Sequence, residues 1–167
     1  MIRNFAFGLL LIACVSACQK EKEKPKEVVV TAKPIASNDM PAFNITQIDG
    51  TKLAFKEVTG KVMIVFFNPS CDHCQREAKL LSEHKDVFKD YVLYFVSPEP
   101  IDSIAKFSVD YKLEEPNVHF GRGEGPEIIR AVGPITTVPT FMVYNNQALV
   151  GRMEGEVTLD KIRQMLK

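Results

Sequence analysis

Two cysteines separated by two residues form the most reactive combination in this chain of 167 residues. The run Cys71-Asp72-His73-Cys74 directly follows an apolar segment and a short Asn-Pro-Ser turn. Thiols at this spacing at the start of a helix can close a small disulfide with little backbone movement. The helix N-terminus stabilises a thiolate at Cys71, whereas Cys74, one turn further on, is shielded. The spacing therefore predicts thiol–disulfide exchange, with Cys71 as nucleophile and Cys74 as resolving thiol.

Metal binding and a structural disulfide are the alternatives for this motif. A zinc site needs two further ligands, and the chain has no second pair of cysteines separated by two residues. Haem attachment needs a histidine directly after the second cysteine, where Gln75 stands. A structural disulfide is uncommon between a buried strand and a helix beside a proline, here Pro69. We therefore predict a redox pair with no metal and no other cofactor.

Composition excludes two classes of protein. Hydrophobic residues make up 46% of the chain, and 21 basic side chains balance 21 acidic ones, giving a formal net charge of zero. A disordered chain would show lower hydrophobicity and a large net charge. A nucleic-acid-binding protein usually has a basic surplus, so we expect no nucleic-acid partner.

The other two cysteines lie in an N-terminal segment that has the pattern of a secretory signal. Arg3 precedes an apolar run of eleven residues at 5–15, which is too short to span a bilayer as a helix. The sequence Val15-Ser16-Ala17-Cys18 resembles the lipobox of bacterial lipoproteins, which implies cleavage before Cys18 and lipidation of its thiol. Cys14 is a rival site. We predict a signal peptide at residues 1–17.

Residues 18–40 are predicted to form a lipidated, charged tether. Alternating Lys and Glu with two prolines leave little to bury. Together with the lipid, this tether predicts a domain held at a membrane in the bacterial cell envelope, on its extracytoplasmic side.

Strand and helix patterns alternate from residue 41 onward, which predicts an α/β domain over 41–167. A hairpin is expected around Asp49-Gly50 and a strand buried on both faces at 62–67. The glycine-rich segment 121–125 lacks the features of a phosphate-binding loop and is predicted to be a flexible connection. The remaining expected elements are a helix at 71–84, a strand at 91–96, a helix over 101–109, a hairpin at 141–150 and a helix at 158–166.

Two segments resemble a known family. Residues 41–77, PAFNITQIDGTKLAFKEVTGKVMIVFFNPSCDHCQRE, resemble the opening of TlpA/ResA-type thiol–disulfide oxidoreductases of the thioredoxin superfamily. Residues 136–141, TTVPTF, resemble the cis-proline loop of that superfamily. The resemblance covers about residues 41–167. It implies a thioredoxin-like fold, in which helices flank a central mixed β-sheet and a β-hairpin lies at the N-terminus.

The resemblance also implies roles for individual residues. Cys71 would attack and Cys74 would resolve, with Pro139 as the cis-proline that faces the disulfide. Val138 would offer its backbone to an extended substrate, and Glu77, on the same helix face as Cys74, would move the resolving thiol's proton. The implied partners are protein disulfides or dithiols and a membrane or extracytoplasmic electron donor, and the implied state is a monomer.

The dipeptide between the cysteines leaves the redox direction open. His73 as a cation would stabilise the thiolate and make the pair more oxidising, while Asp72 would oppose it. The family context favours a disulfide reductase. Other departures are Ser70, where the superfamily usually has tryptophan, and Val65, where thioredoxin has a buried acid.

Two other functions are weighed against this reading. A peroxiredoxin-like thiol peroxidase would need a Pro-x-x-x-Thr/Ser-x-x-Cys pattern, which neither Cys71 nor Cys74 has. A copper-binding assembly factor resembling Sco proteins would use a wider cysteine spacing and a distal histidine, for which only His119 is available. Retention of Cu(I) without disulfide reduction would favour the copper protein.

Overall fold

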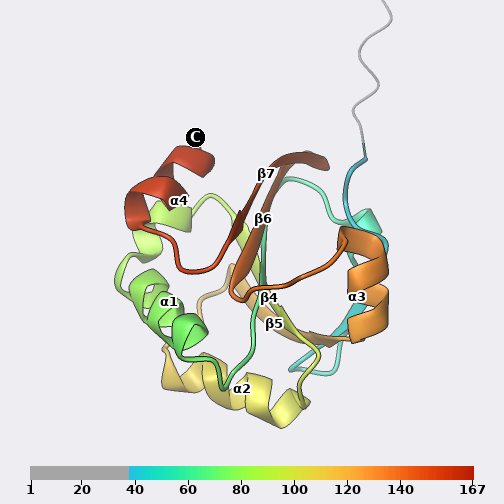
Figure 1. The fold of residues 1–167 in the computed structure, drawn as a ribbon, viewed down its shortest axis with the longest axis horizontal. Coiled ribbons are helices and arrows are strands. Elements are labelled where there is room, and N and C mark those ends of the chain that lie inside the picture. Colours follow the sequence, from blue (N-terminus) through green and yellow to red (C-terminus); the bar gives the residue numbers. More distant parts are fainter. Residues whose placement is uncertain (1–37) are drawn as a thin grey trace, which may run out of the picture. The chain divides into compact units, whose positions relative to one another are not determined.

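A computed structural model describes residues 38–167 of the chain, which form a mixed β-sheet with helices on both of its faces (Figure 1). The seven strands are β1 (Asn44–Gln47), β2 (Lys52–Ala54), β3 (Lys61–Phe66), β4 (Val92–Ser97), β5 (Val118–Gly123), β6 (Thr140–Asn145) and β7 (Ala148–Glu154). The α-helices of this part are α1 (Asp72–Glu83), α2 (Ile101–Asp110), α3 (Gly125–Val132) and α4 (Leu159–Met165), and short 3₁₀ turns lie at Phe55–Glu57 and Lys85–Phe88.

The order of the strands explains where the reactive motif lies. The order is β2-β1-β5-β4-β3-β6-β7, in which β3 runs parallel to β4 and β4 parallel to β5, while the other pairs are antiparallel. The strand that leads into the cysteine motif, β3, therefore lies inside the sheet between β4 and β6. The predicted mixed sheet and the N-terminal hairpin formed by β1 and β2 are confirmed.

Each face of the sheet has its own apolar core. Met63 and Val65 of β3 belong to the cluster that packs under α1, α2 and α4. Val62 and Ile64 belong to the second cluster, which includes Ile128 of α3. Figure 1 shows the same division, with α1, α2 and α4 on one side of the strands and α3 on the other. The prediction of a strand buried on both faces is confirmed.

The prediction of a flexible connection at residues 121–125 is wrong. Residues Gly121 and Gly123 belong to β5, which pairs with β1 and β4. A β-carbon at Gly121 would lie 2.8 Å from Cδ1 of Ile45 and 3.1 Å from the carbonyl oxygen of Thr46. Glycine fits here because Ile45 and the backbone of Thr46, on the neighbouring strand β1, leave no room for a β-carbon. The next residues, from Gly125, begin α3 with a proline in its first turn, a helix start that the sequence analysis did not recognise.

Of the predicted segment boundaries, the one at residue 40 falls within the part of the chain that the structure describes. Met40, the last residue of the predicted tether, is 2% exposed and packs in the core beside Phe43. The predicted signal peptide, the lipidated Cys18 and most of the tether lie outside the described residues. Among residues 38–167, no helix combines the length and the apolar character needed to cross a membrane.

Candidate active site

The turn between β3 and α1 fixes Cys71 at the start of the helix. Asn68 shapes this turn, because its Oδ1 accepts hydrogen bonds from the N–H and the hydroxyl of Ser70 at 2.8 and 2.7 Å. Its carbonyl oxygen accepts the N–H of Cys71 at 3.1 Å. Cys71 is the N-cap residue of α1 and is half-buried. Cys71 therefore lies at the positive end of the helix dipole and is only partly covered by the rest of the domain.

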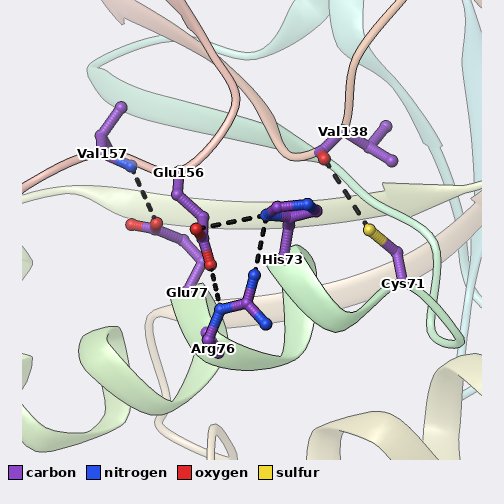
Figure 2. Close-up of polar contacts among 7 residues, drawn as sticks. All are labelled: Cys71, His73, Arg76, Glu77, Val138, Glu156 and Val157. Atoms are coloured by element: carbon purple, nitrogen blue, oxygen red, sulfur yellow. Dashed lines mark hydrogen bonds and ion pairs between the residues drawn. The ribbon is translucent and has the colours of Figure 1, made fainter.

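Cys71 faces a loop that is distant in the sequence. Its Sγ lies 3.8 Å from the carbonyl oxygen of Val138 (Figure 2). The peptide bond between Val138 and Pro139 is cis. The structure therefore brings together the cysteine motif and the loop that the family resemblance indicated.

Cys74 differs from Cys71 in its burial and in the state of its thiol. It is 2% exposed and belongs to the core cluster under α1. Burial raises the pKa of the Cys74 thiol to about 12, and the nearby Cys71 and Glu77 add to this effect. At neutral pH Cys74 is therefore a protonated thiol, and it needs a base before it can act as a nucleophile.

Glu77 is a buried acid one helical turn after Cys74. Its side chain is 3% exposed, and its Oε2 accepts a hydrogen bond from the N–H of Val157 at 3.0 Å. Its Oε1 is buried without a hydrogen-bond partner among the described residues. Burial raises the pKa of Glu77 to about 7; the Val157 N–H opposes this rise, and the charge of Glu156 adds to it. A carboxyl group that titrates near neutral pH is suited to exchange a proton with a neighbouring thiol.

A cluster of exposed polar side chains lies beside these groups. The carboxylate of Glu156 contacts Nε of Arg76, and its Oε2 lies 3.2 Å from Nδ1 of His73. Nη2 of Arg76 lies 2.8 Å from the same ring nitrogen. Asp72, in the first turn of α1, is exposed. Nδ1 of His73 therefore faces both the carboxylate of Glu156 and the guanidinium of Arg76.

Three residues of this arrangement were not recognised in the sequence: Arg76, Glu156 and Val157. Contacts between residues 76–77 and 156–157 span about eighty positions, and no motif marks the later segment. The only sequence feature that points to this segment is Glu156, a charged residue that follows Gly155 shortly before the last helix. Within residues 38–167, no group of three or more His, Cys, Asp or Glu side chains is placed to hold a metal ion.

The raised pKa of Glu77 predicts how Glu77→Gln changes stability. In the folded protein the Glu77 carboxyl keeps its proton up to about pH 7, whereas the ordinary pKa of a glutamate is 4.5. This difference in pKa corresponds to about 3 kcal/mol. The stability contributed by the protonated acid is present below pH 4.5 and is lost as the pH rises through 7. We therefore expect Glu77→Gln to raise the free energy of unfolding at pH 8 by up to about 3 kcal/mol.

Urea unfolding at pH 8 and pH 4 checks this expectation, with Glu83→Gln, an exposed glutamate on the same helix, as the control. The increase in the free energy of unfolding caused by Glu77→Gln should disappear at pH 4. An equal effect at both pH values, or a loss of stability at pH 8, would contradict it.

The family of the chain is shown by comparison with known proteins. A model of the AhpC/TSA family matches residues 36–148, which include both cysteines of the motif and Pro139. The chain belongs to the AhpC/TSA family. The matched region ends before the segment that carries Glu156 and Val157.

Relatives of this AhpC/TSA protein include proteins named thiol–disulfide oxidoreductase ResA. The protein from Bacillus thuringiensis subsp. konkukian is 24% identical over 133 residues, and that from Bacillus anthracis is 25% identical over 133 residues. Both alignments span 77% of this chain and 75% of the relative. The resemblance to ResA-type proteins is thereby confirmed.

Solved structures confirm the thioredoxin-like fold of this AhpC/TSA protein. StoA from Bacillus subtilis superposes with a TM-score of 0.59 at 17% identity, over 75% of this chain and 96% of StoA. A secreted disulfide oxidoreductase from Mycobacterium tuberculosis gives a TM-score of 0.60 at 16% identity, over 75% and 94% of the two chains. At these identities the structural likeness concerns the fold alone.

Proposed function

We propose that this protein is a thiol–disulfide oxidoreductase that uses Cys71 and Cys74 as its redox pair. The observation that carries the proposal is the placement of two unequal thiols at one helix start. Cys71 is accessible at the N-cap beside the Val138–Pro139 loop, and Cys74 is buried behind it. Similarity to proteins named thiol–disulfide oxidoreductase supports the same chemistry.

The reaction divides into two exchange steps. In the first, the Cys71 thiolate attacks one sulfur of a substrate disulfide, forms a mixed disulfide and releases the other substrate sulfur as a thiolate, which takes up a proton. In the second, Glu77 accepts the proton of Cys74, whose thiolate attacks Cys71 Sγ and displaces the remaining substrate sulfur. Two electrons pass from the cysteine pair to the substrate, which leaves as a dithiol. An electron donor then reduces the Cys71–Cys74 disulfide.

The loop at Val138 and Pro139 is proposed to hold the substrate beside Cys71. The carbonyl oxygen of Val138 lies 3.8 Å from Cys71 Sγ, so a chain joined to that sulfur must run past this backbone. Pro139 has no N–H that competes for the thiolate. An extended segment of a protein substrate can therefore pair with Val138 while its cysteine reaches Cys71.

The direction and place of the reaction are part of the proposal. Similarity to ResA-type proteins favours reduction of protein disulfides over oxidation. Asp72 and His73 are proposed to tune the pair, with the carboxylate of Glu156 lying 3.2 Å from Nδ1 of His73. Lipidation at Cys18 and the charged tether would place the domain at the extracytoplasmic side of a bacterial membrane, near its donor and its protein partners.

A turnover assay tests the proposed function against its two alternatives. The protein without its first 17 residues is mixed with insulin and dithiothreitol, and insulin reduction is followed by turbidity. We expect catalysis above the uncatalysed rate, and none after alkylation of the cysteines. Faster turnover of hydrogen peroxide than of insulin would indicate a peroxidase instead. Tight Cu(I) retention without insulin reduction would indicate a copper protein.

A further inference from the structure

Two neighbouring residues of α1 contact two neighbouring residues of the segment between β7 and α4. Arg76 pairs with the carboxylate of Glu156 on the exposed side of the helix. The next helix residue, Glu77, points inward and accepts the N–H of Val157 at 3.0 Å. Figure 2 shows the two contacts side by side. Because Glu156 and Val157 are adjacent, a surface ion pair and a buried hydrogen bond hold the same short piece of backbone.

The surface contact places the carboxylate of Glu156 beside two side chains of α1. Glu156 Oε2 lies 3.2 Å from Nδ1 of His73, in addition to the contact of Oε1 with Arg76. Nη2 of Arg76 lies 2.8 Å from Nδ1 of His73, and the two residues are one turn apart on α1. The carboxylate of Glu156 is thus held to α1 by Arg76, beside the ring of His73, and this contact restricts where the following N–H can lie.

We propose that Arg76 and Glu156 are positioning residues, whose ion pair holds the N–H of Val157 against Glu77 and thereby sets the pH at which Glu77 takes the proton of Cys74. The inference rests on the proposed function and deepens it. Neither residue is bonded to the reacting sulfur atoms, and their positioning effect passes through the backbone of Val157 to Glu77. The active site then has a second half, contributed by the segment before the last helix and lying outside the region that the family model matches.

The charges around Glu77 give the two partners opposite effects. The titratable groups whose charge acts on Glu77 within the described part are Cys74, on its own helix, and Glu156, from the facing segment. The Val157 N–H lowers the pKa of Glu77 and the Glu156 charge raises it. Arg76→Gln loosens the hydrogen bond from the Val157 N–H to Glu77 and removes the positive charge that balances Glu156. Both changes disfavour the Glu77 carboxylate. Glu156→Gln removes the repelling charge but keeps an oxygen that Arg76 can bind.

The test is a titration of Glu77 by NMR in protein labelled with ¹³C at the glutamate carboxyl, with Glu77→Gln used to assign the signal. We expect Arg76→Gln to move the midpoint upward, and Glu156→Gln to move it downward, each by about half a pH unit. Glu154→Gln is the matched control, because Glu154 is an exposed carboxylate at the end of β7, two residues before Glu156, and pairs with Arg152. This control should leave the midpoint in place.

The pH midpoint for release of a mixed disulfide should move in the same directions as the Glu77 midpoint, upward in Arg76→Gln and downward in Glu156→Gln. A Glu77 midpoint unchanged in Arg76→Gln, or moved equally by Glu154→Gln and Glu156→Gln, would overturn the inference. The titration does not depend on activity, so its outcome is separate from the proposed function. If the midpoints move as expected but Glu77→Gln releases the mixed disulfide at the wild-type rate, the proposed role of Glu77 fails instead.

Discussion

Replacing Cys71 with serine is expected to abolish disulfide exchange, whereas Cys74→Ser is expected to trap substrates as mixed disulfides. Cys71 is the accessible thiol at the helix N-cap, and serine there has no thiolate to attack with. Cys74 is 2% exposed, so an external disulfide reaches Cys71 first. Without Cys74, the first exchange still occurs but the mixed disulfide is no longer resolved from within the protein.

Insulin turnover and non-reducing electrophoresis measure the two effects. Cys71→Ser should reduce catalysis to the uncatalysed rate, and Cys74→Ser should form an adduct that a strong reductant removes. Mass spectrometry of the digested adduct should place the link at Cys71. Wild-type turnover by Cys71→Ser, or a link found at Cys74 in the wild-type protein, would contradict the assignment.

The resolving step is expected to depend on Glu77 and to slow below pH 7. Burial raises the pKa of Cys74 to about 12, so this thiol holds its proton at neutral pH. Glu77, with its pKa raised to about 7 by burial, is ionised only above that pH and can then accept the proton. The rate of mixed-disulfide release should therefore rise with pH through about 7. Loss of a positioned base typically costs at least about 10²-fold, so Glu77→Gln should slow this step by that amount.

Single-turnover release of a preformed Cys71 adduct, measured between pH 5 and pH 9, checks this dependence. Glu77→Gln should also remove the inflection near pH 7. Glu83→Gln, on the same helix but exposed, should keep both the rate and the inflection. A pH profile with the wild-type inflection in Glu77→Gln would show that another group accepts the proton.

Local patterns were sufficient for much of the fold. The apolar run at 62–67 predicted the central strand because a strand covered on both faces leaves few polar positions. The helix after Cys71 and the hairpins at both ends of the sheet followed from the spacing of apolar residues and from turn dipeptides. The cis bond before Pro139 came from the family resemblance alone, since a proline at the start of a strand is usually ordinary.

Other features depend on contacts that local patterns do not record. Gly121 and Gly123 resemble loop residues in sequence, yet they lie in β5. They are glycines because Ile45 and Ile128 leave no room for a side chain there. The residue pair Glu156 and Val157 completes the surroundings of Glu77 only because the fold brings the segment after β7 next to α1. The spacing in the sequence places Glu77 on the same helix face as Cys74, but the N–H of Val157 that Glu77 accepts comes from a segment eighty residues away.

The equilibrium between the reduced and oxidised Cys71–Cys74 pair tests the central claim most directly. The protein is equilibrated with mixtures of reduced and oxidised glutathione, or of dithiothreitol in its two forms, then quenched and weighed by mass spectrometry. We predict one two-electron transition that removes two hydrogens and joins Cys71 to Cys74. A reductase should have a potential nearer to that of thioredoxin, about −270 mV, than to that of DsbA, about −120 mV. A pair that forms no internal disulfide in any of these mixtures would contradict the account.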